Sequence, residues 1–395
     1  MRSTLTAPRP GPAFRPGPEP SHRDGPRLKD VRMTSRRILL KGTLFGGAAA
    51  LLPAAASASG DGSILRLPAP VGPYPVGMQR VHLTDPSRTD PWVGGVRELM
   101  LTVLYPARSV RGFSRAPQLT PAEAREFAGL APRIRPGLPE PGTVDWGAVL
   151  THGYMGAPPL PGRRPVLVYS PGGGDSRTLG TTLAEDLASH GRVVVLVDHP
   201  GDASQVELPT GMRTTVLIGP PDPATFRMMV DTRIADLRLV VDRLDDLPLA
   251  PVVDLRRIGM YGHSAGGTAA VYAARRDRRV GAVANLEGYL DLYPTPVVYP
   301  TPVGLGRPLL LFRTDGFDGA ARIASSWASL PGHRRLLPDA NHWAFTDYGS
   351  FVPRLRTSGL VTATARNALV GPGDPAVTLT EVRRRVGTFF ACHLE

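Results

Sequence analysis

One serine lies in the segment of this chain that is best suited to covalent chemistry. Ser264 stands in the run Gly262-His-Ser-Ala-Gly-Gly267, after an apolar stretch typical of a buried strand and before residues with helical spacing. A strand, a tight turn and a helix in this order form a nucleophile elbow, in which glycines permit a strained turn that exposes the serine hydroxyl. The pattern predicts that Ser264 is a nucleophile. Because the motif is short and the chain has 44 glycines, other residues must support it.

A serine nucleophile needs a base, because a hydroxyl is weakly nucleophilic near neutral pH. Three histidines follow Ser264, namely His333, His342 and His393. His333 begins a predicted strand, and His393 lies near the C-terminus on a predicted helix. His342 lies instead in a loop after the last predicted strand, and such a loop can bring an imidazole back to the serine. We therefore predict that His342 is the general base.

The acid that orients the base has two candidates. Glu287 ends the strand after the elbow, and Asp315 ends the next strand, each directly before a glycine. Asp315 has the usual acid position of a fold in which serine, acid and histidine follow in this order. Either carboxylate could accept the imidazole N–H, and either could instead only cap its loop. The residues alone leave this choice open.

Backbone N–H groups near the serine could stabilise the oxyanion of a tetrahedral intermediate. The N–H of Ala265, at the predicted start of a helix, is one candidate. The other is Gly173 in the loop Ser170-Pro-Gly-Gly-Gly-Asp175, because glycines permit close approach to a substrate. This loop lacks the lysine of a phosphate-binding P-loop.

The remaining histidines, carboxylates and the single cysteine do not indicate a metal site. His263 is expected to pack around the elbow, whereas His199 and Asp202 either line the pocket or form a turn. Cys392 is expected to have no role. No His, Cys and carboxylate cluster has the spacing of a zinc site, so we expect neither a catalytic metal nor a cofactor.

The elements that must position these residues alternate between strands and helices. Helical patterns separate and follow predicted strands at 166–169, 193–197, 257–263, 280–286, 309–312 and 334–337. Such alternation predicts an α/β fold with a mostly parallel central sheet and helices on both faces. Together with the elbow, it indicates the α/β-hydrolase fold. The glycine-rich loop, the elbow and the later loops follow strands, at the edge where such sheets bind ligands.

The part of the chain before these elements has weaker patterns. Two strands are predicted at 78–83 and 98–105. Residues 107–163 are rich in Pro, Gly and Arg with little periodicity, and they predict a long excursion that faces substrate or covers a sheet edge. We expect a single α/β-hydrolase domain over 59–395.

The first 58 residues have the character of an export leader. Ser35-Arg36-Arg37 precedes an apolar run from Gly42 to Leu52 and then Ala56-Ser57-Ala58, which is typical of a twin-arginine signal peptide with its cleavage site. The run is too short to span a bilayer, so we expect no stable membrane insertion. Residues 1–32 are patternless, and translation could begin at Met33. The sequence thus predicts a secreted, extracellular protein that is exported by the twin-arginine (Tat) machinery.

The formal net charge of +12 does not indicate a nucleic-acid site. Residues 1–58 contain 10 basic and 3 acidic residues, which leaves 36 basic and 31 acidic residues for the rest. The remaining arginines are scattered over the sequence. We therefore expect a mildly basic solvated surface and no nucleic-acid partner.

Several motifs together resemble those of secreted bacterial serine esterases related to platelet-activating factor acetylhydrolase. The resemblance extends over roughly 70–390 and rests on matches in order along the chain at Gly72-Pro-Tyr-Pro-Val-Gly77, Leu104-Tyr-Pro106, Tyr169-Ser-Pro-Gly-Gly-Gly174, Leu187-Ala-Ser-His-Gly191, Val197-Asp-His199, Gly262-His-Ser-Ala-Gly-Gly267, Asn285-Leu-Glu-Gly288 and His342-Trp-Ala-Phe-Thr-Asp347.

The resemblance implies a catalytic triad of Ser264, Glu287 and His342, because the acid of this family follows the strand after the elbow. Two residues depart from the family. Glu287 replaces the usual Asp, which lengthens the arm and keeps Asp315 as an alternative acid. Pro171 stands where the family often has His, near the predicted oxyanion donor Gly173.

The function that the resemblance implies is hydrolysis of carboxylic esters through an acyl-enzyme. The expected substrates are small-molecule or lipid esters, either short-acyl esters or phospholipid acyl groups such as that of 1-alkyl-2-acetylglycerophosphocholine. A polyester or cutin hydrolase, or a lipase, of the same fold is an alternative. A catalytically silent relative that binds ligands in the same pocket is an alternative of a different class.

Overall fold

A ten-stranded sheet organises the part of the chain that the computed structural model describes, residues 65–217, 219, 221–290 and 305–395. The strand order is β12-β11-β10-β9-β5-β6-β2-β1-β4-β3. The predicted leader, 1–58, lies outside the described residues, and every described element belongs to the unit Ser59–Glu395.

The strands of the sheet are β1 (Val76–Thr89), β2 (Val96–Pro106), β3 (Arg115–Pro117), β4 (Leu150–Met155), β5 (Arg164–Ser170), β6 (Val193–Val197), β9 (Val253–His263), β10 (Val280–Leu286), β11 (Leu309–Thr314) and β12 (His333–Leu337), and a separate hairpin consists of β7 (Gln205–Leu208) and β8 (Gly211–Thr214). The α-helices are α1 (Pro121–Ile134), α2 (Thr181–Ser189), α3 (Pro223–Asp242), α4 (Ala265–Arg276), α5 (Ala320–Ser326), α6 (Tyr348–Thr357), α7 (Ala363–Val370) and α8 (Pro375–Leu394).

The centre of the sheet is parallel. Strands β6, β5, β9, β10, β11 and β12 pair in parallel, whereas β2 pairs antiparallel with both β6 and β1. Parallel strands need crossover connections, and α2, α3, α4 and α5 lie in those from β5 to β6, from β6 to β9, from β9 to β10 and from β11 to β12. The predicted α/β-hydrolase fold with a mostly parallel sheet is therefore confirmed.

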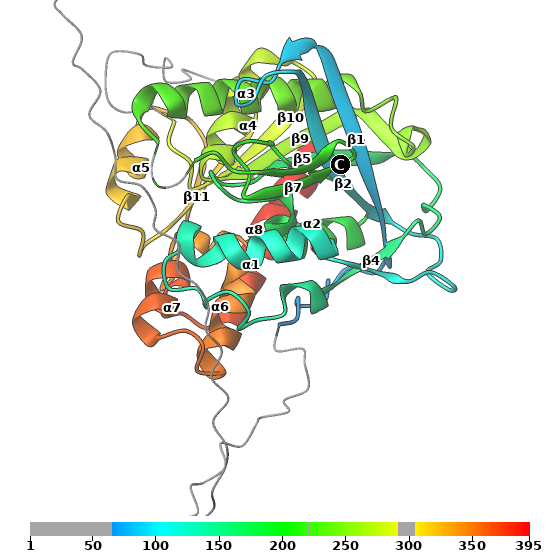
Figure 1. Ribbon diagram of the computed structural model, residues 1–395. Helices are drawn as coiled ribbons and strands as arrows, with labels where there is room; N and C mark the ends of the chain where they lie inside the picture. Colours follow the sequence, from blue (N-terminus) through cyan, green and yellow to red (C-terminus); the bar gives the residue numbers. More distant parts are fainter. Residues whose placement is uncertain (1–64, 218, 220, 291–304) are drawn as a thin grey trace, which may run out of the picture. The chain divides into compact units, whose positions relative to one another are not determined.

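Two hydrophobic cores cover the two faces of the sheet. In β5, Leu167 and Tyr169 belong to one core and Val166 and Val168 to the other, as the alternation of side chains along a strand requires. The first core includes buried residues of α2, α6 and α8, and the second includes those of α3, α4 and α5. Figure 1 shows these two sets of helices on opposite sides of the sheet. Helices on both faces explain why the central strands β5 and β6 are apolar over consecutive residues, at 165–169 and 193–197.

Residues 107–163 are more regular than the sequence indicates. They contain α1, whose first turn has a capping box in which the Thr120 hydroxyl accepts from the Glu123 N–H and the Glu123 carboxylate accepts from the Thr120 N–H. They also contain β4, which pairs in parallel with β1, and β3, which pairs with β4. The segment thus extends one edge of the sheet, and the prediction of an edge-covering excursion is correct while its helix was missed.

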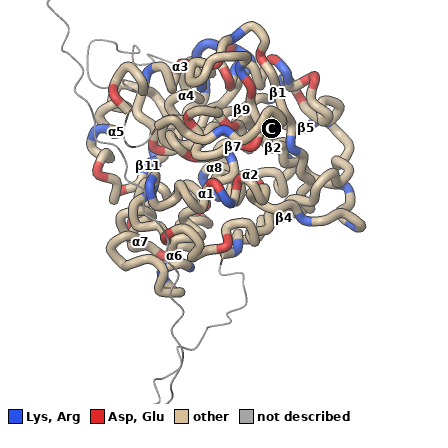
Figure 2. Tube along the Cα trace, in the orientation of Figure 1, with Lys and Arg blue, Asp and Glu red and all other residues tan. Residues whose placement is uncertain are grey.

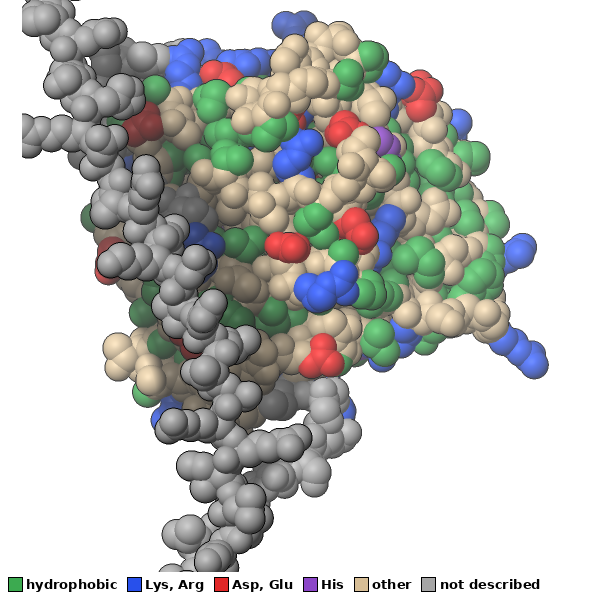
Figure 3. All heavy atoms as spheres, viewed as in Figure 1, with side chains coloured by type: hydrophobic (Ala, Val, Ile, Leu, Met, Phe, Trp, Pro, Cys, Tyr) green, Lys and Arg blue, Asp and Glu red, His purple; other side chains and the backbone are tan. Residues whose placement is uncertain are grey.

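Charged side chains of both signs are dispersed over the described chain. Figure 2 shows basic and acidic positions alternating along the trace, and on the face drawn in Figure 3 they are mixed with apolar side chains. Within the described ranges, no helix has the length and apolar character to cross a membrane.

Candidate active site

Ser264 lies in a strained turn between a strand and a helix. Strand β9 ends at His263 and α4 begins at Ala265, so Ser264 alone forms the turn, with φ 53° and ψ −125°. A non-glycine residue rarely adopts a positive φ, and such strain is concentrated at functional sites. A side chain at position 266 would overlap the carbonyl oxygen of Ser170, which explains the glycine there. This geometry is that of a nucleophile elbow.

His342 and Glu287 are joined by a hydrogen bond. His342 begins the short 3-10 helix His342–Phe345 after β12, and Glu287 directly follows β10. The distance between His342 Nδ1 and Glu287 Oε2 is 2.9 Å. The other carboxylate oxygen, Oε1, accepts from the N–H and the hydroxyl of Thr314, at 2.6 and 2.8 Å. Both carboxylate oxygens of Glu287 are thus hydrogen-bonded, and the contact with the imidazole uses Nδ1 and not Nε2.

Asp315 has a different set of partners. Its two carboxylate oxygens accept the N–H groups of Asp339 and Ala340, at 3.1 and 3.3 Å. These contacts cap the loop that precedes His342. Of the two acids that the residues left open, the structure brings Glu287 to the imidazole and uses Asp315 to hold the loop.

Burial controls the charge of the histidine and the glutamate. Desolvation, together with the nearby Arg135 guanidinium, lowers the pKa of His342 below its ordinary value. Desolvation raises the pKa of Glu287 to about 7, against the effect of the Thr314 hydrogen bonds. The two groups are coupled by their short contact, so they take up the next proton as a pair. Because burial penalises the net negative charge of the pair, its apparent pKa is raised above that of an ordinary glutamic acid.

Ser264 and His342 line one pocket of about 500 Å³. Ser264 is partly exposed, whereas His342 is buried. The wall is mostly apolar and aromatic, and among the described residues that line it the basic side chains have no acidic counterpart. The other lining residues are Arg133, Ile134, Arg135, Pro136, Gly173, Gly174, Leu217, Gly219, Pro221, Phe226, Met229, Ala265, Phe317 and Trp343.

A second hollow of about 500 Å³ lies between β12 and the start of α8. Its lining includes Leu337, Val377 and Glu381, but neither a histidine nor a residue of the elbow. We therefore place the candidate site at the pocket of Ser264, whose lining includes the serine and the histidine that is hydrogen-bonded to Glu287.

The two predicted oxyanion donors lie in the wall of this pocket. Ala265 is the first residue of α4, where backbone N–H groups have no partner within the helix. In the loop before α2, the Gly174 N–H donates to Asp202 at 3.1 Å and the Gly173 carbonyl accepts from Arg135 at 3.2 Å. The Gly173 N–H donates to no residue that the structure describes. It is therefore available to a ligand in the pocket.

The two other predicted histidines lie behind the pocket. His263 Nε2 donates to the carbonyl oxygen of His342 at 2.9 Å, and the two rings lie 4.5 Å apart between centroids. His263 thus packs around the elbow and supports the base. His199 is fully buried and contacts Ser170 and Asp236 instead of the pocket. Asp202 holds the glycine-rich loop, as described above.

The sequence reasoning missed three residues around the imidazole. Phe317 stacks on the His342 ring with 4.1 Å between centroids, and Trp343 meets it edge-on at 5.1 Å. Arg135 lies over the Trp343 ring at 4.7 Å. Trp343 could have been found from its place beside the predicted base, but the contacts of Arg135 and Phe317 join distant parts of the chain.

In the described part of the chain, no group of three or more His, Cys, Asp or Glu residues could hold a metal ion.

Comparison with known proteins agrees with this fold and geometry. The family model of platelet-activating factor acetylhydrolase, isoform II, matches residues 145–208. A protein of Arthroderma benhamiae described as a probable 1-alkyl-2-acetylglycerophosphocholine esterase is 26% identical over 378 residues, which cover 89% of this chain and 93% of that protein. The structure of a ferulic acid esterase from Streptomyces cinnamoneus is 35% identical with a TM-score of 0.67, over 83% of this chain and 93% of that chain. The chain thus belongs to the platelet-activating factor acetylhydrolase-like esterases of the α/β-hydrolase fold.

Proposed function

We propose that this protein is an exported serine carboxylic-ester hydrolase that works through an acyl-enzyme. The observation that carries the proposal is that Ser264, in a strained elbow, lines one pocket together with His342, whose imidazole is hydrogen-bonded to Glu287. The two relatives reported above are both described as esterases, which supports the reaction class. A binding protein would have no need for a strained serine beside a buried imidazole–carboxylate pair.

In the proposed reaction, Ser264 Oγ attacks the ester carbonyl carbon while His342 Nε2 takes its proton. Glu287 holds the imidazole through Nδ1 and balances the charge of the imidazolium. The N–H groups of Gly173 and Ala265 stabilise the oxyanion. His342 then protonates the alcohol that leaves. A water molecule, activated by the same imidazole, cleaves the acyl-enzyme and restores the serine.

For the substrate, we propose esters with short acyl groups, including acyl groups of phospholipids. The pocket of about 500 Å³ supports a small acyl chain, and its lining, which contains Arg133 and Arg135 and no acidic side chain among the described residues, suits an alcohol part with a phosphate. Esters of aromatic acids are a second candidate, since Phe226, Phe317 and Trp343 line the pocket and a relative is described as a ferulic acid esterase. Turnover of p-nitrophenyl esters of increasing length, an sn-2-acetyl phospholipid and methyl ferulate separates these classes.

A fluorophosphonate probe tests the serine mechanism directly. The wild-type protein should bind one probe molecule covalently, because the activated serine attacks phosphorus and the oxyanion donors hold the adduct. Mass spectrometry of the intact protein and of its peptides should locate the probe on Ser264. Ser264→Ala should remain unlabelled. A folded wild-type protein that is not labelled would contradict the enzyme proposal and favour the silent binding protein.

The pH profile of the wild-type enzyme provides an independent test. Catalysis needs the histidine–glutamate pair without its extra proton, and burial raises the pKa of Glu287 to about 7. We therefore expect kcat/KM to fall as the pH is lowered below about 7, by about tenfold per pH unit. The profile should be measured between pH 4 and 8 with a neutral ester. An acid limb with an apparent pKa near 4, the ordinary value of a glutamic acid, would show that burial does not set the ionisation of this pair.

The proposed export rests on the sequence of residues 1–58. Protein secreted by its native host should begin after Ala58 and not at Met1 or Met33. N-terminal sequencing of the secreted protein tests this. Export that persists after Arg36 and Arg37 are both replaced by Lys would contradict the twin-arginine route, because that route depends on the paired arginines.

A further inference from the structure

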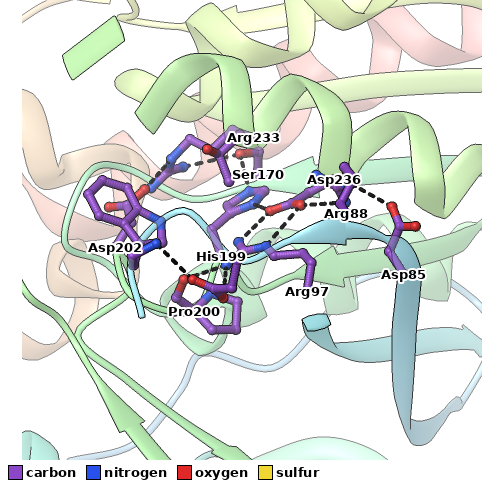
Figure 4. Close-up of polar contacts among 12 residues, drawn as sticks. Asp85, Arg88, Arg97, Ser170, His199, Pro200, Asp202, Arg233 and Asp236 are labelled. Carbon is purple, nitrogen blue, oxygen red and sulfur yellow. Dashed lines mark hydrogen bonds and ion pairs between the residues drawn. The ribbon is translucent and has the colours of Figure 1, made fainter. Parts of the chain in front are cut away.

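Two buried side chains of opposite charge hold the glycine-rich loop from behind. Asp202 follows β6 and Arg233 lies within α3, and both are at most 1% exposed. Arg233 Nε donates to Asp202 Oδ2 at 2.5 Å. Figure 4 shows this ion pair beside Ser170, the last residue of β5 and the residue from which the loop begins.

The ion pair engages polar backbone groups on both sides of Gly173. Arg233 donates to the carbonyl oxygens of the two residues before Gly173, at 2.5 and 3.0 Å. Asp202 accepts from the N–H of Gly174 at 3.1 Å. A carbonyl oxygen that faced the pocket would repel an oxyanion, and here a cation holds both oxygens. The N–H of Gly173 is left as the uncommitted donor between them.

A chain of directed hydrogen bonds fixes the position of Arg233. Burial opposes the ionisation of Asp236, but Arg97 lowers the pKa of Asp236 and keeps it a carboxylate. Arg97 Nη2 and Nε donate to the two carboxylate oxygens of Asp236, at 2.7 and 3.2 Å. Burial and the Arg233 guanidinium lower the pKa of His199, so its ring is neutral. The carboxylate accepts from His199 Nδ1 at 2.9 Å, and the neutral ring then accepts from the Ser170 hydroxyl at Nε2, at 2.8 Å. The hydroxyl oxygen then accepts from Arg233 Nη1 at 3.2 Å. In Figure 4, His199 lies between Ser170 and Asp236. Each hydrogen bond therefore has only one possible direction.

The ion pair has little value as a source of stability. Removing two charges from water costs about as much free energy as their attraction returns, and apolar side chains often replace such pairs without loss. Apolar side chains could not, however, accept an N–H and donate to two carbonyl groups at once. The charges of Asp202 and Arg233 are therefore needed to orient the glycine-rich loop.

We infer that Asp202 and Arg233 are positioning residues for ester hydrolysis, which orient the loop so that the Gly173 N–H meets the oxyanion. The inference rests on the proposed function, because the oxyanion belongs to that reaction. It assigns the two residues a role in the transition state and not in binding of the ground-state substrate.

Asp202→Ala removes the acceptor of the Gly174 N–H and the partner of Arg233. We expect kcat on p-nitrophenyl acetate to fall about 10²-fold, with KM changed less than about threefold, because an oxyanion donor acts in the transition state. Affinity for a trifluoromethyl ketone, which forms a tetrahedral adduct with the serine, should fall by a similar factor. Asp202→Asn should recover most of the lost kcat, since its amide oxygen can still accept the Gly174 N–H.

Asp254→Ala is the matched control. Asp254, at the start of β9 and thus at its end far from Ser264, is also buried and also accepts a backbone N–H and an arginine Nε, from Arg256 and Arg257, at 3.0 and 2.9 Å. Its replacement should lower the melting temperature but leave kcat and the ketone affinity unchanged. A merely structural role of Asp202 would make the two alanine variants behave alike.

Equal kcat and equal ketone affinity in Asp202→Ala and Asp254→Ala would overturn the inference. Arg233→Lys keeps the test decisive if Asp202→Ala does not fold, because it retains the buried charge but lacks the guanidinium fork. Its kcat and ketone affinity should both fall about tenfold, and unchanged values would again overturn the inference. Failure of the proposed function is a distinct outcome, in which the wild-type protein neither hydrolyses esters nor reacts with the fluorophosphonate.

Discussion

Replacement of Ser264 by Ala should lower kcat on p-nitrophenyl acetate by about 10⁶-fold, and replacement of His342 by Ala should lower it by about as much. The two side chains act in one step, because the serine hydroxyl is a weak nucleophile unless the imidazole takes its proton. The double variant should therefore be no slower than either single variant. The residual rate reflects substrate binding and the oxyanion donors alone.

His393→Ala is a suitable control for the loss of a histidine. His393 lies on α8, where its ring is 5.5 Å from that of His333 and distant in the fold from the pocket of Ser264. This variant should retain the wild-type kcat. Thermal unfolding should show that all variants are folded, and titration with the fluorophosphonate should exclude contamination by active enzyme. Losses that multiply in the double variant would mean that Ser264 and His342 act independently, which contradicts the proposed reaction.

The elbow could be predicted from the sequence because its determinants are local. Glycines, a preceding apolar run and a following helical pattern all fall within a dozen residues of Ser264, and the structure has β9, the strained turn and α4 in that order. His342 could be predicted because few histidines follow the serine and only this one follows the last predicted strand without lying on a predicted helix. Order along the chain is a strong constraint in a parallel sheet.

The regular elements that the sequence analysis missed lack a clear hydrophobic pattern. Helix α1 contains Pro132, and its sequence is rich in small and charged residues, although its capping box Thr120-Pro-Ala-Glu123 was visible. Helices α6 and α7 and the hairpin of β7 and β8 are short. Short elements depend on packing against the rest of the fold more than on local propensity.

The buried hydrogen-bond network of Arg97, Asp236, His199, Ser170 and Arg233 could not be predicted from the sequence for another reason. Arg97, His199 and Arg233 come from separate parts of the chain, and nothing in their spacing joins them. Isolated arginines in a basic chain usually lie on the surface, and the sequence analysis assigned them there. Their burial depends on the register of β2 against β6 and on the position of α3, which the sequence does not reveal.

Replacement of Glu287 by Gln should lower kcat by about 10⁴-fold, whereas Asp315→Asn should change it by less than about threefold. The amide of a glutamine can donate to Nδ1, which would stabilise the imidazole tautomer with its proton on Nε2 and remove the lone pair that the serine needs. Asp315 touches only the backbone of the loop at Asp339 and Ala340, so its replacement should lower the melting temperature more than the rate. Steady-state kinetics and thermal unfolding of both variants check this.

The residual activity of Glu287→Gln should also have a different pH profile. In the wild-type protein, the buried pair takes up its proton near pH 7, because desolvation raises the pKa of Glu287. Without the carboxylate, only His342 titrates, and burial together with Arg135 lowers its pKa below the ordinary value. The acid limb of kcat/KM should therefore move to lower pH. An unchanged acid limb would show that the ionisation of the histidine–glutamate pair does not set the pH profile.

Glu287→Asp separates the charge of the acid from its reach. Glu287 has a left-handed backbone, with φ 62°, and its Oε1 accepts from the N–H and the hydroxyl of Thr314. Aspartate would keep the charge but could not hold both Thr314 and the imidazole from the same backbone position, because it is one methylene shorter. Its kcat should lie between those of the wild type and Glu287→Gln. If Asp315→Asn instead loses several orders of magnitude while both Glu287 variants remain active, the acid lies on β11 and the hydrogen bond from His342 to Glu287 is not the catalytic one.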